Sequence, residues 1–556
     1  MSESLLDQAR EWACQDPDPA TRAELEQVLA AVEAGDEAAA SDLADRFAGT
    51  LEFGTAGLRG ALGAGPNRMN RVVVTRAAAG LAAYLRVNGA TADDAVVIGY
   101  DARHNSDVFA RDTAEVMTGA GLRALLLPGQ LPTPLLAYAI RKLGCVAGVM
   151  VTASHNPPQD NGYKVYLGDG SQIVSPADVE IAEQITAVGA LADVPRGEPG
   201  QQLDDAIVDD YVASVLGVVG DGPRALKLVY TPLHGVGNGT VLRVLDEAGF
   251  PAPAVVSEQQ DPDPEFSTVV FPNPEEPGAM DLAMALASEV DADLVVANDP
   301  DADRCAAAVP GPHGWQMLRG DEVGALLGDH LLRKGKQGIY AASIVSSSLL
   351  GKLARAAGQP YVDTLTGFKW IGRLEGLAFG YEEALGYCVD PDQVKDKDGV
   401  SALLLLCEVA AKTKAEGRTL VDLLDDIAVR HGLHATDQLS ARVSDLAEIG
   451  AAMERLRATP PTELGGLAVE SVEDLSIGSE ALPPTDGLRY QLADGARVIV
   501  RPSGTEPKIK CYLEVVVPVE DASAGEGVRR AVEAARIVAA GRLDALRIGI
   551  KQAAGI

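Results

Sequence analysis

Strand-like and helix-like segments alternate along this chain up to about residue 432, and this order constrains the fold more than any other feature of the sequence. In the first unit, apolar runs at 95–100 and 123–127 are separated and followed by helical patterns at 107–120 and 134–142. Strands that are joined through helices pair in parallel, because a parallel pair requires a long crossover connection. We therefore expect an α/β fold with a mostly parallel sheet in each such unit.

The alternation predicts four domains, the first of which begins with helices within residues 2–50. Three α/β units of similar order are followed by a distinct α+β unit, which is closed by a strand at 511–517 and a helix at 522–541. A length of 556 residues agrees with three or four domains. The predicted boundaries place the α/β domains at 1–205, 206–318 and 319–432, and the α+β domain at 433–556.

Charge and cysteine content narrow the class of protein. Asp and Glu number 80 against 47 Lys and Arg, so the net charge is -33, which disfavours nucleic acid and membranes as partners. An anionic substrate must therefore meet local positive charge or a metal ion. The six cysteines contain no Cys-x-x-Cys pair, and the N-terminus lacks the pattern of a signal peptide, so we expect a reduced, cytoplasmic setting.

A polar segment follows the apolar run at 145–151. It reads Thr-Ala-Ser-His-Asn-Pro at 152–157, with a second proline at 158 that ends regular structure. Ser154 and His155 thus lie at the end of an expected strand, where catalytic groups of α/β proteins collect. The alternative is a polar turn in which both side chains make only local hydrogen bonds.

Three carboxylates alternate after the expected strand at 293–298. Asp299, Asp301 and Asp303 offer the hard oxygen ligands that Mg²⁺ and Ca²⁺ require. An EF-hand is rejected, because Arg304 and Pro310 occupy the places of its glycine and its final glutamate. The alternative is a solvated acidic turn, but a single Mg²⁺ site agrees better with the position at a strand end.

Three further segments offer groups that could bind a phosphorylated ligand. Residues 501–508 combine Arg, Ser, Gly, Thr and Lys after a strand, which suits a phosphate dianion. Arg59 lies in a glycine-rich segment at 53–60 that reads as an anion-facing loop, and Glu382 with Glu383 follows the expected strand at 377–381. Ordinary turns and a solvated strand edge remain the alternative interpretations.

Four motifs in this order resemble those of the α-D-phosphohexomutases, and the resemblance covers nearly the whole chain. They are Thr-Ala-Ser-His-Asn-Pro at 152–157, Asp-Pro-Asp-Ala-Asp-Arg at 299–304, Glu-Glu-Ala-Leu-Gly at 382–386 and Arg-Pro-Ser-Gly-Thr at 501–505. The resemblance implies four domains around a central cleft, the last with a TATA-binding-protein-like fold. It also implies a phosphosugar substrate, Mg²⁺ and a hexose 1,6-bisphosphate as activator and intermediate. We expect a monomer or weak homodimer.

The same resemblance implies a role for individual residues. Ser154 would carry a phosphoryl group and would hold Mg²⁺ together with Asp299, Asp301 and Asp303. Lys164 matches the general acid/base, with Arg59 near it and His155 in support. The residues expected at the substrate are Arg304, Gly367, Glu382, Lys397, Arg501, Ser503, Gly504 and Thr505.

The segments at 366–370 and 381–387 are closer to the branch of phosphoglucomutases and type-2 phosphopentomutases. Phe368 stands where shorter mannose-phosphate mutases usually have His, and Ala384 stands where many relatives have Ser. The expected reaction is glucose 1-phosphate to glucose 6-phosphate, through a phosphoserine and a bisphosphate. The alternatives are a phosphopentomutase that acts on ribose 1-phosphate and a phosphomannomutase. A metal-dependent phosphatase and a non-catalytic sugar-phosphate sensor are alternatives of a different class.

Overall fold

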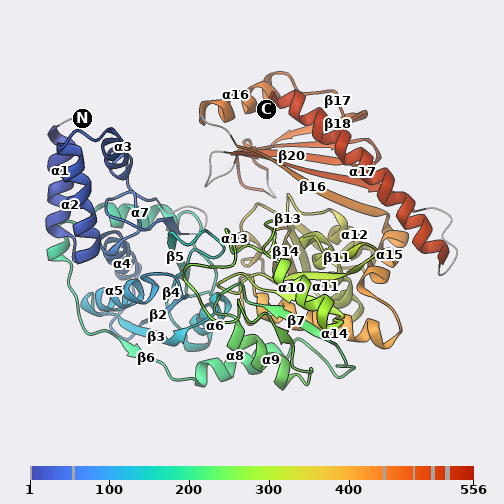
Figure 1. Ribbon diagram of the computed structural model, residues 1–556, viewed down its shortest axis with the longest axis horizontal. Helices are drawn as coiled ribbons and strands as arrows, with labels where there is room; N and C mark the ends of the chain where they lie inside the picture. Colours follow the sequence, from blue (N-terminus) through green and yellow to red (C-terminus); the bar gives the residue numbers. More distant parts are fainter. Residues whose placement is uncertain (1–2, 53–56, 443–445, 480–481, 503–507, 520–525) are drawn as a thin grey trace. The chain divides into compact units, whose positions relative to one another are not determined.

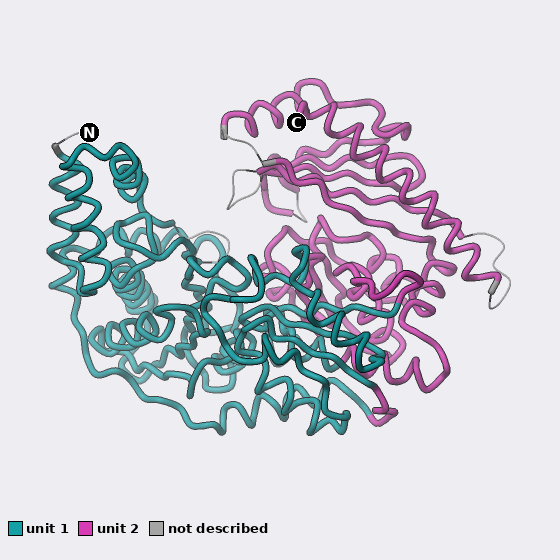
Figure 2. The backbone as a smooth tube through the Cα atoms, in the orientation of Figure 1, with its two compact units in different colours: residues 1–220, 227–310, 390–404 teal, residues 221–226, 311–389, 405–556 magenta. Residues whose placement is uncertain are grey.

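The structure is a computed structural model that describes residues 3–52, 57–442, 446–479, 482–502, 508–519 and 526–556. The chain forms two compact units (Figure 2). Unit 1 comprises residues 1–220, 227–310 and 390–404, and unit 2 comprises residues 221–226, 311–389 and 405–556. Each unit holds two sheets, and Figure 1 labels their helices and strands along the chain.

The first sheet of unit 1 has the strand order β1-β5-β4-β2-β3-β6. Strands β4, β2, β3 and β6 are parallel, as the alternation predicted, whereas β5 runs antiparallel to both β4 and β1. The antiparallel edge was not predicted. The strands are β1 (Leu58–Ala61), β2 (Ala95–Tyr100), β3 (Arg123–Gln130), β4 (Ala147–Val151), β5 (Asp160–Leu167) and β6 (Gln201–Gln202).

Helices α4 and α5 bury their apolar faces in the core of this sheet, whereas α1, α2 and α3 pack in a separate cluster. Asn70 caps α4 by accepting a hydrogen bond from the backbone N–H of Val73, and Leu81 of α4 packs in the same cluster as Ile98 of β2 and Phe109 of α5. The helices are α1 (Glu3–Gln15), α2 (Pro19–Glu33), α3 (Glu37–Arg46), α4 (Arg71–Val87), α5 (Ser106–Gly119), α6 (Thr133–Leu143), α7 (Ala177–Thr186) and α8 (Ala206–Leu216), with a 3₁₀ turn η1 (Leu191–Asp193).

The second sheet has the order β11-β10-β9-β7-β8, in which β9, β7 and β8 are parallel, β10 is antiparallel to β9 and β11 (Gly314–Met317) is the edge strand beside β10. The residues of β9 are fully buried, which explains why this strand appears in the sequence as a continuous apolar run. The elements are β7 (Leu228–Thr231), α9 (Asn238–Glu247), β8 (Ala254–Val255), α10 (Asp281–Val290), β9 (Leu294–Ala297) and β10 (Ala306–Gly311).

The first sheet of unit 2 has the order β13-β12-β14-β15, in which only the β14–β15 pair is antiparallel. The elements of this region are α11 (Gly320–Arg333), β12 (Ile339–Ser343), α12 (Leu349–Ala356), β13 (Tyr361–Thr364), α13 (Phe368–Ile371), β14 (Leu377–Glu382), β15 (Gly386–Cys388), α14 (Gly399–Ala415) and α15 (Leu420–His431). Each of the first three sheets forms mixed α/β structure with its helices, which confirms the expected fold class.

The last sheet is antiparallel, with the order β16-β21-β20-β19-β18-β17, and helix α17 packs on β21 and β16 (Figure 1). The expected α+β domain is confirmed, but α17 (Glu526–Ala554) continues beyond the predicted end at 541, because Leu543, Leu546 and Ile550 keep its buried face apolar. The other elements are β16 (Leu433–Arg442), α16 (Leu446–Ala458), β17 (Glu463–Leu464), β18 (Leu467–Asp474), β19 (Leu488–Leu492), η2 (Ala493–Gly495), β20 (Arg497–Pro502) and β21 (Lys508–Val517).

Among the helices of the described ranges, none combines the length and the hydropathy that a membrane crossing requires. Five of the six cysteines are buried and only Cys14 is exposed.

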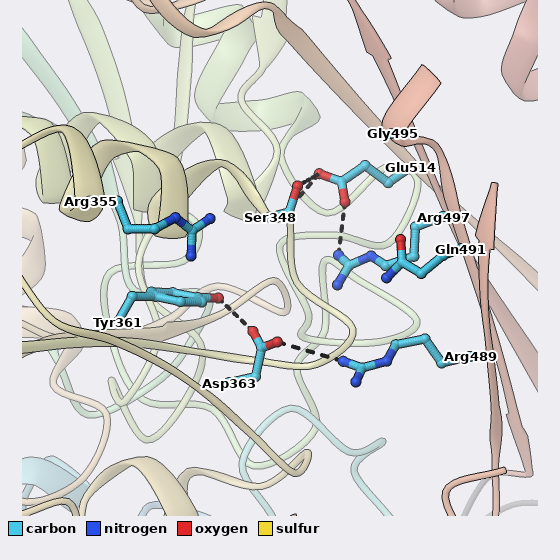
Figure 3. A pocket seen from close by; sticks show the side chains of 9 residues that line it. All are labelled: Ser348, Arg355, Tyr361, Asp363, Arg489, Gln491, Gly495, Arg497 and Glu514. Atoms are coloured by element: carbon cyan, nitrogen blue, oxygen red, sulfur yellow. Dashed lines mark hydrogen bonds and ion pairs between the residues drawn. The ribbon is translucent and has the colours of Figure 1, made fainter. Parts of the chain in front are cut away.

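A buried ion pair of the last sheet also bonds to the segment between β12 and α12. The carboxylate of Glu514 on β21 lies 2.9 Å from the Arg497 guanidinium. It accepts hydrogen bonds from the Ser347 hydroxyl at 2.7 Å and from the backbone N–H of Ser348 at 2.9 Å, and it lies 3.0 Å from Nδ1 of His434. Glu514, Arg497 and Ser348 line a polar cavity of about 140 Å³ (Figure 3). Burial raises the pKa of Glu514, but Arg497 and His434 lower it further, so that it lies well below its ordinary value.

We expect Glu514→Gln to lower the free energy of unfolding by about 3–5 kcal/mol at neutral pH, because it leaves Arg497 buried without its counter-charge. The folded-state pKa lies below the unfolded one, so this contribution is present above about pH 4.5 and is lost as the pH falls below it. Urea unfolding at pH 7 and pH 4 measures both effects. Glu473→Gln is the matched control, since the Glu473–Arg489 pair is partly exposed and should contribute under about 1 kcal/mol. Equal losses from the two variants would contradict this prediction.

Candidate active site

The serine of the 152–157 segment is buried directly after β4. Its backbone N–H donates to the hydroxyl of Thr152 at 2.9 Å, and its own hydroxyl donates to Oδ2 of Asp299 at 2.6 Å. Nδ1 of His155 lies 3.1 Å from Oγ of Ser154. Ser154 has φ +52°, a left-handed conformation that side-chain-bearing residues rarely adopt and that is typical of strained functional positions. The loop therefore directs the serine hydroxyl toward the acidic segment after β9.

That acidic segment brings the three aspartates together. Ligand oxygens of Asp299, Asp301 and Asp303 lie within 4.8 Å of one another, and all three residues are buried. Oδ1 of Asp301 and Oδ1 of Asp303 are buried and have no hydrogen-bond donor among the described residues. Burial and the neighbouring Asp303 raise the pKa of Asp301 to about 6. Converging carboxylate oxygens that lack donors fit a hard divalent cation, so this cluster can hold a metal.

Two lysines approach the same carboxylates. Lys164 lies on β5 opposite Met150 of β4, and its ammonium contacts Asp301 at 2.7 Å and Asp303 at 3.0 Å. The Lys397 ammonium lies 3.3 Å from Asp303. Burial lowers the pKa of Lys164, but Asp301 and Asp303 raise it, and the net pKa lies above its ordinary value. This is the opposite of the lowered pKa that a neutral general base requires.

Arg59, His155 and Arg304 complete the surroundings of Ser154. Arg59 was expected in a loop, but it lies on β1 opposite Gly162; residues 53–56 of the expected loop lie outside the described residues. Its guanidinium donates to the side-chain oxygen of Asn156 at 3.0 Å. Burial, Arg304 and Arg59 lower the pKa of His155 well below its ordinary value, so that the imidazole is neutral at pH 7. The Nε atom of Arg304 lies 3.9 Å from Asp299 and 3.8 Å from Asp303.

The expected sugar-binding residues lie in unit 2. Oε1 of Glu382 accepts a hydrogen bond from the backbone N–H of Gly367 at 2.7 Å, so these two residues are neighbours. Gly367 has φ +115°, which explains the glycine. Glu383 turns elsewhere and accepts from the hydroxyls of Ser343 at 3.2 Å and Ser346 at 3.1 Å. Glu383 therefore contacts serine hydroxyls, whereas Glu382 contacts the backbone of Gly367.

The predicted phosphate-binding segment is only partly described. Arg501 lies on β20 and is partly buried, and its backbone pairs with Lys510 of β21. Ser503, Gly504 and Thr505 lie outside the described residues.

Family models agree with this arrangement along most of the chain. Domains I, II and III of the phosphoglucomutase/phosphomannomutase type, each described as alpha/beta/alpha, match residues 50–191, 209–312 and 319–430. The C-terminal domain of the same type matches residues 439–529. The chain belongs to the phosphoglucomutase/phosphomannomutase family. The resemblance to α-D-phosphohexomutases is thereby confirmed, and the protein is a phosphosugar mutase, an intramolecular phosphotransferase.

Relatives of this phosphosugar mutase carry both names of the family. A "probable phosphomannomutase" of Haemophilus influenzae is 50% identical over 455 residues, which cover 80% of this chain and 93% of the relative. A phosphoglucomutase of Staphylococcus aureus is 35% identical over 511 residues, covering 86% and 92%. The crystal structure of a family protein from Burkholderia thailandensis covers 88% of this chain and 98% of its own, with a TM-score of 0.67 and 22% identity, and supports the fold.

Several residues of this mutase site escaped the sequence analysis. Thr133, at the start of α6, donates to Oδ2 of Asp301 at 2.5 Å. Asp396 accepts from Tyr166 and Gln172, each at 2.7 Å, and lies 3.3 Å from the Lys397 ammonium. Arg103 contacts the serine loop itself. Only Arg103 had a usable signal, since it lies in a polar turn at the end of an expected strand.

Proposed function

We propose that this mutase moves a phosphoryl group between C1 and C6 of a hexose, with glucose 1-phosphate to glucose 6-phosphate as its preferred reaction. The observation that carries the proposal is the 2.6 Å contact between the Ser154 hydroxyl and Asp299, inside a trio of converging carboxylates. A nucleophile held against a candidate metal site is the arrangement that phosphoryl transfer requires, because this chemistry depends on placement and charge neutralisation.

In this proposal Ser154 carries a phosphoryl group and donates it to the free hydroxyl of a sugar 1-phosphate. The resulting bisphosphate reorients and returns its other phosphoryl group to Ser154. A hexose 1,6-bisphosphate is therefore both intermediate and activator. Asp299, Asp301, Asp303 and the seryl phosphate would hold Mg²⁺, which neutralises the charge of the transferring group.

The basic residues around Ser154 bind and orient the reacting groups. Lys164 is the proposed general acid/base, which would pass the proton lost by the attacking sugar hydroxyl to the Ser154 oxygen that is released, and its contacts with Asp301 and Asp303 hold it in reach of the serine loop. Arg59 would balance the phosphoryl charge beside it, while neutral His155, if its proton is on Nδ1, can donate a hydrogen bond to the Ser154 oxygen. Arg304 and Lys397 add positive charge for the substrate.

Substrate recognition is proposed for unit 2 and for the segment after β20. Glu382, held by Gly367, would accept hydrogen bonds from vicinal sugar hydroxyls. Arg501, Ser503, Gly504 and Thr505 would bind the phosphate that does not react. We propose the domain boundaries 1–205, 206–318, 319–432 and 433–556 for these functions. A cytoplasmic location and a monomeric or weakly dimeric state also stay predictions from the sequence.

The choice of sugar is tested by comparing mutase rates on glucose 1-phosphate, mannose 1-phosphate and ribose 1-phosphate, with Mg²⁺ and glucose 1,6-bisphosphate. We expect kcat/KM for glucose 1-phosphate to exceed the other two by about tenfold or more. Contacts of Glu382 with the C3 and C4 hydroxyls would discriminate against ribose. Mannose shares these hydroxyls and differs from glucose only at C2, so the expected preference over mannose rests on the motif pattern alone. The support is the motif pattern around Phe368 and Ala384. A preference for mannose or ribose would contradict the glucose assignment while leaving the mutase assignment intact.

A further inference from the structure

Arg103 makes an unusual set of contacts with the serine loop. It is 4% exposed and follows β2 in the turn at 101–106. One guanidinium nitrogen, Nη2, donates to the backbone carbonyls of Ser154 at 2.6 Å and Asn156 at 2.5 Å. The other, Nη1, donates to those of Pro157 at 2.8 Å and Asp160 at 3.1 Å. A single side chain thus binds four carbonyls along the 154–160 segment.

The guanidinium is itself held on two sides. Asp101 accepts from the backbone N–H of Arg103 at 3.0 Å, and its other oxygen lies 3.4 Å from Nε. The ring of Phe266 lies 4.8 Å from the guanidinium carbon, in cation–π geometry. Phe266 comes from the segment between β8 and α10, is buried and has φ +47°, a conformation that costs an aromatic residue strain. The second sheet of unit 1 therefore supplies a cover for an arginine of the first.

These contacts bear on the conformation of Ser154. The left-handed backbone of Ser154 is costly by roughly 1–3 kcal/mol and persists only where its surroundings over-determine it. The Arg103 guanidinium contacts the loop carbonyls, Asp101 and Phe266, and none of the charged residues assigned to the substrate is among these partners. Its hydrogen bonds therefore act on the reaction through the loop, and its positive charge also acts on Asp301 and Asp299.

We propose that Arg103, covered by Phe266, is a positioning residue that holds Ser154 in the conformation required for phosphoryl transfer. The inference rests on the proposed function of Ser154 as the group that is phosphorylated. In this proposal Phe266, from a loop beside the second sheet of unit 1, helps to align Ser154, which follows a strand of the first sheet.

Arg103→Lys tests this role. Lysine keeps the charge but is a point donor with three N–H groups, so it cannot span four carbonyls as the planar guanidinium does. We expect kcat to fall about 100-fold with KM within about twofold of wild type, because a displacement of about 1 Å at a reacting group costs this much. The rate of Ser154 phosphorylation by glucose 1,6-bisphosphate, followed by intact mass, should fall by the same factor.

Arg71→Lys is the matched control. Arg71 binds Asp112 through two nitrogens at 2.7 Å and 2.8 Å in the same unit, so the variant loses an equivalent fork away from the serine loop. Its kcat should stay within about twofold of wild type. If both variants lost kcat equally, or if Arg103→Lys kept kcat within about threefold, the positioning role would be overturned.

Phe266→Leu decides the matter if Arg103→Lys does not fold. Leucine keeps an apolar side chain at this position but removes the aromatic face, so kcat should fall about threefold to tenfold at unchanged KM. Unchanged kcat in this variant would overturn the proposal. A wild-type enzyme that is never phosphorylated on Ser154 would instead refute the proposed function, which keeps the two failures distinguishable.

Discussion

Ser154→Ala is expected to abolish mutase activity, with a fall in kcat of about 10⁴-fold or more. The Ser154 hydroxyl is the proposed phosphoryl carrier. Among the described serines, it alone donates a hydrogen bond to one of the three clustered aspartates, which is Asp299. Alanine keeps Cβ, so the left-handed backbone at this position acquires no new steric clash. The variant should therefore fold, bind sugar phosphate and fail to exchange phosphoryl groups.

The measurement is a coupled mutase assay together with intact mass after incubation with glucose 1,6-bisphosphate. The wild-type mass should increase by one phosphoryl group and that of Ser154→Ala should not. Ser288→Ala is the control, since Ser288 is exposed on α10 and its hydroxyl bonds only to the carbonyl of Met284 among the described residues. Retention of more than a few per cent of wild-type kcat by Ser154→Ala would refute the phosphoserine mechanism.

Removal of the metal, or of one carboxylate that would hold it, is expected to have the second largest effect. Chelation should lower kcat about 10³-fold or more, with recovery on addition of Mg²⁺, because a divalent cation would coordinate the transferring group and neutralise more of its charge than a single Lys or Arg side chain does. Asp301→Asn should lower kcat by a similar factor, since Oδ1 of Asp301 is buried without a donor and is thus an available ligand oxygen.

Calorimetric titration of the unphosphorylated protein with Mn²⁺ or Mg²⁺ provides a readout besides activity. We expect Asp301→Asn to weaken binding at least tenfold, whereas Asp291→Asn should leave it unchanged, because Asp291 is a fully solvated carboxylate ten residues earlier in the chain. Equal metal affinity in wild type and Asp301→Asn would exclude the three aspartates as the metal site.

Local sequence patterns were sufficient to predict individual helices and strands and the cluster of three aspartates after β9. The helical pattern at 107–120 predicted α5, and the expected strand at 293–298 predicted β9. Asp299, Asp301 and Asp303 lie within six residues, so the turn after β9 alone brings their carboxylates together. In each case the interacting groups are neighbours in the chain, and short-range periodicity or spacing determines their positions.

The extent of α17 and the place of Arg59 were not accessible in this way. The predicted helix ended at Gly541, yet the apolar period resumes with Leu543 and Leu546, and packing on β21 outweighs the low helix propensity of glycine. Arg59 is drawn into β1 because the antiparallel strand β5 offers it a pairing edge.

The sequence by itself determined the fold class, the family and the chemical type of each loop, because those depend on residue types at short spacing. Only the tertiary structure decided which distant loops meet. The β4–β5 register sets Lys164 opposite Met150, so that its ammonium reaches Asp301 and Asp303. The contact of Arg103 with the serine loop likewise depends on the order of the strands in the sheet. Contacts of this kind depend on how strands are ordered and registered in a sheet, and that arrangement leaves no local pattern in the chain.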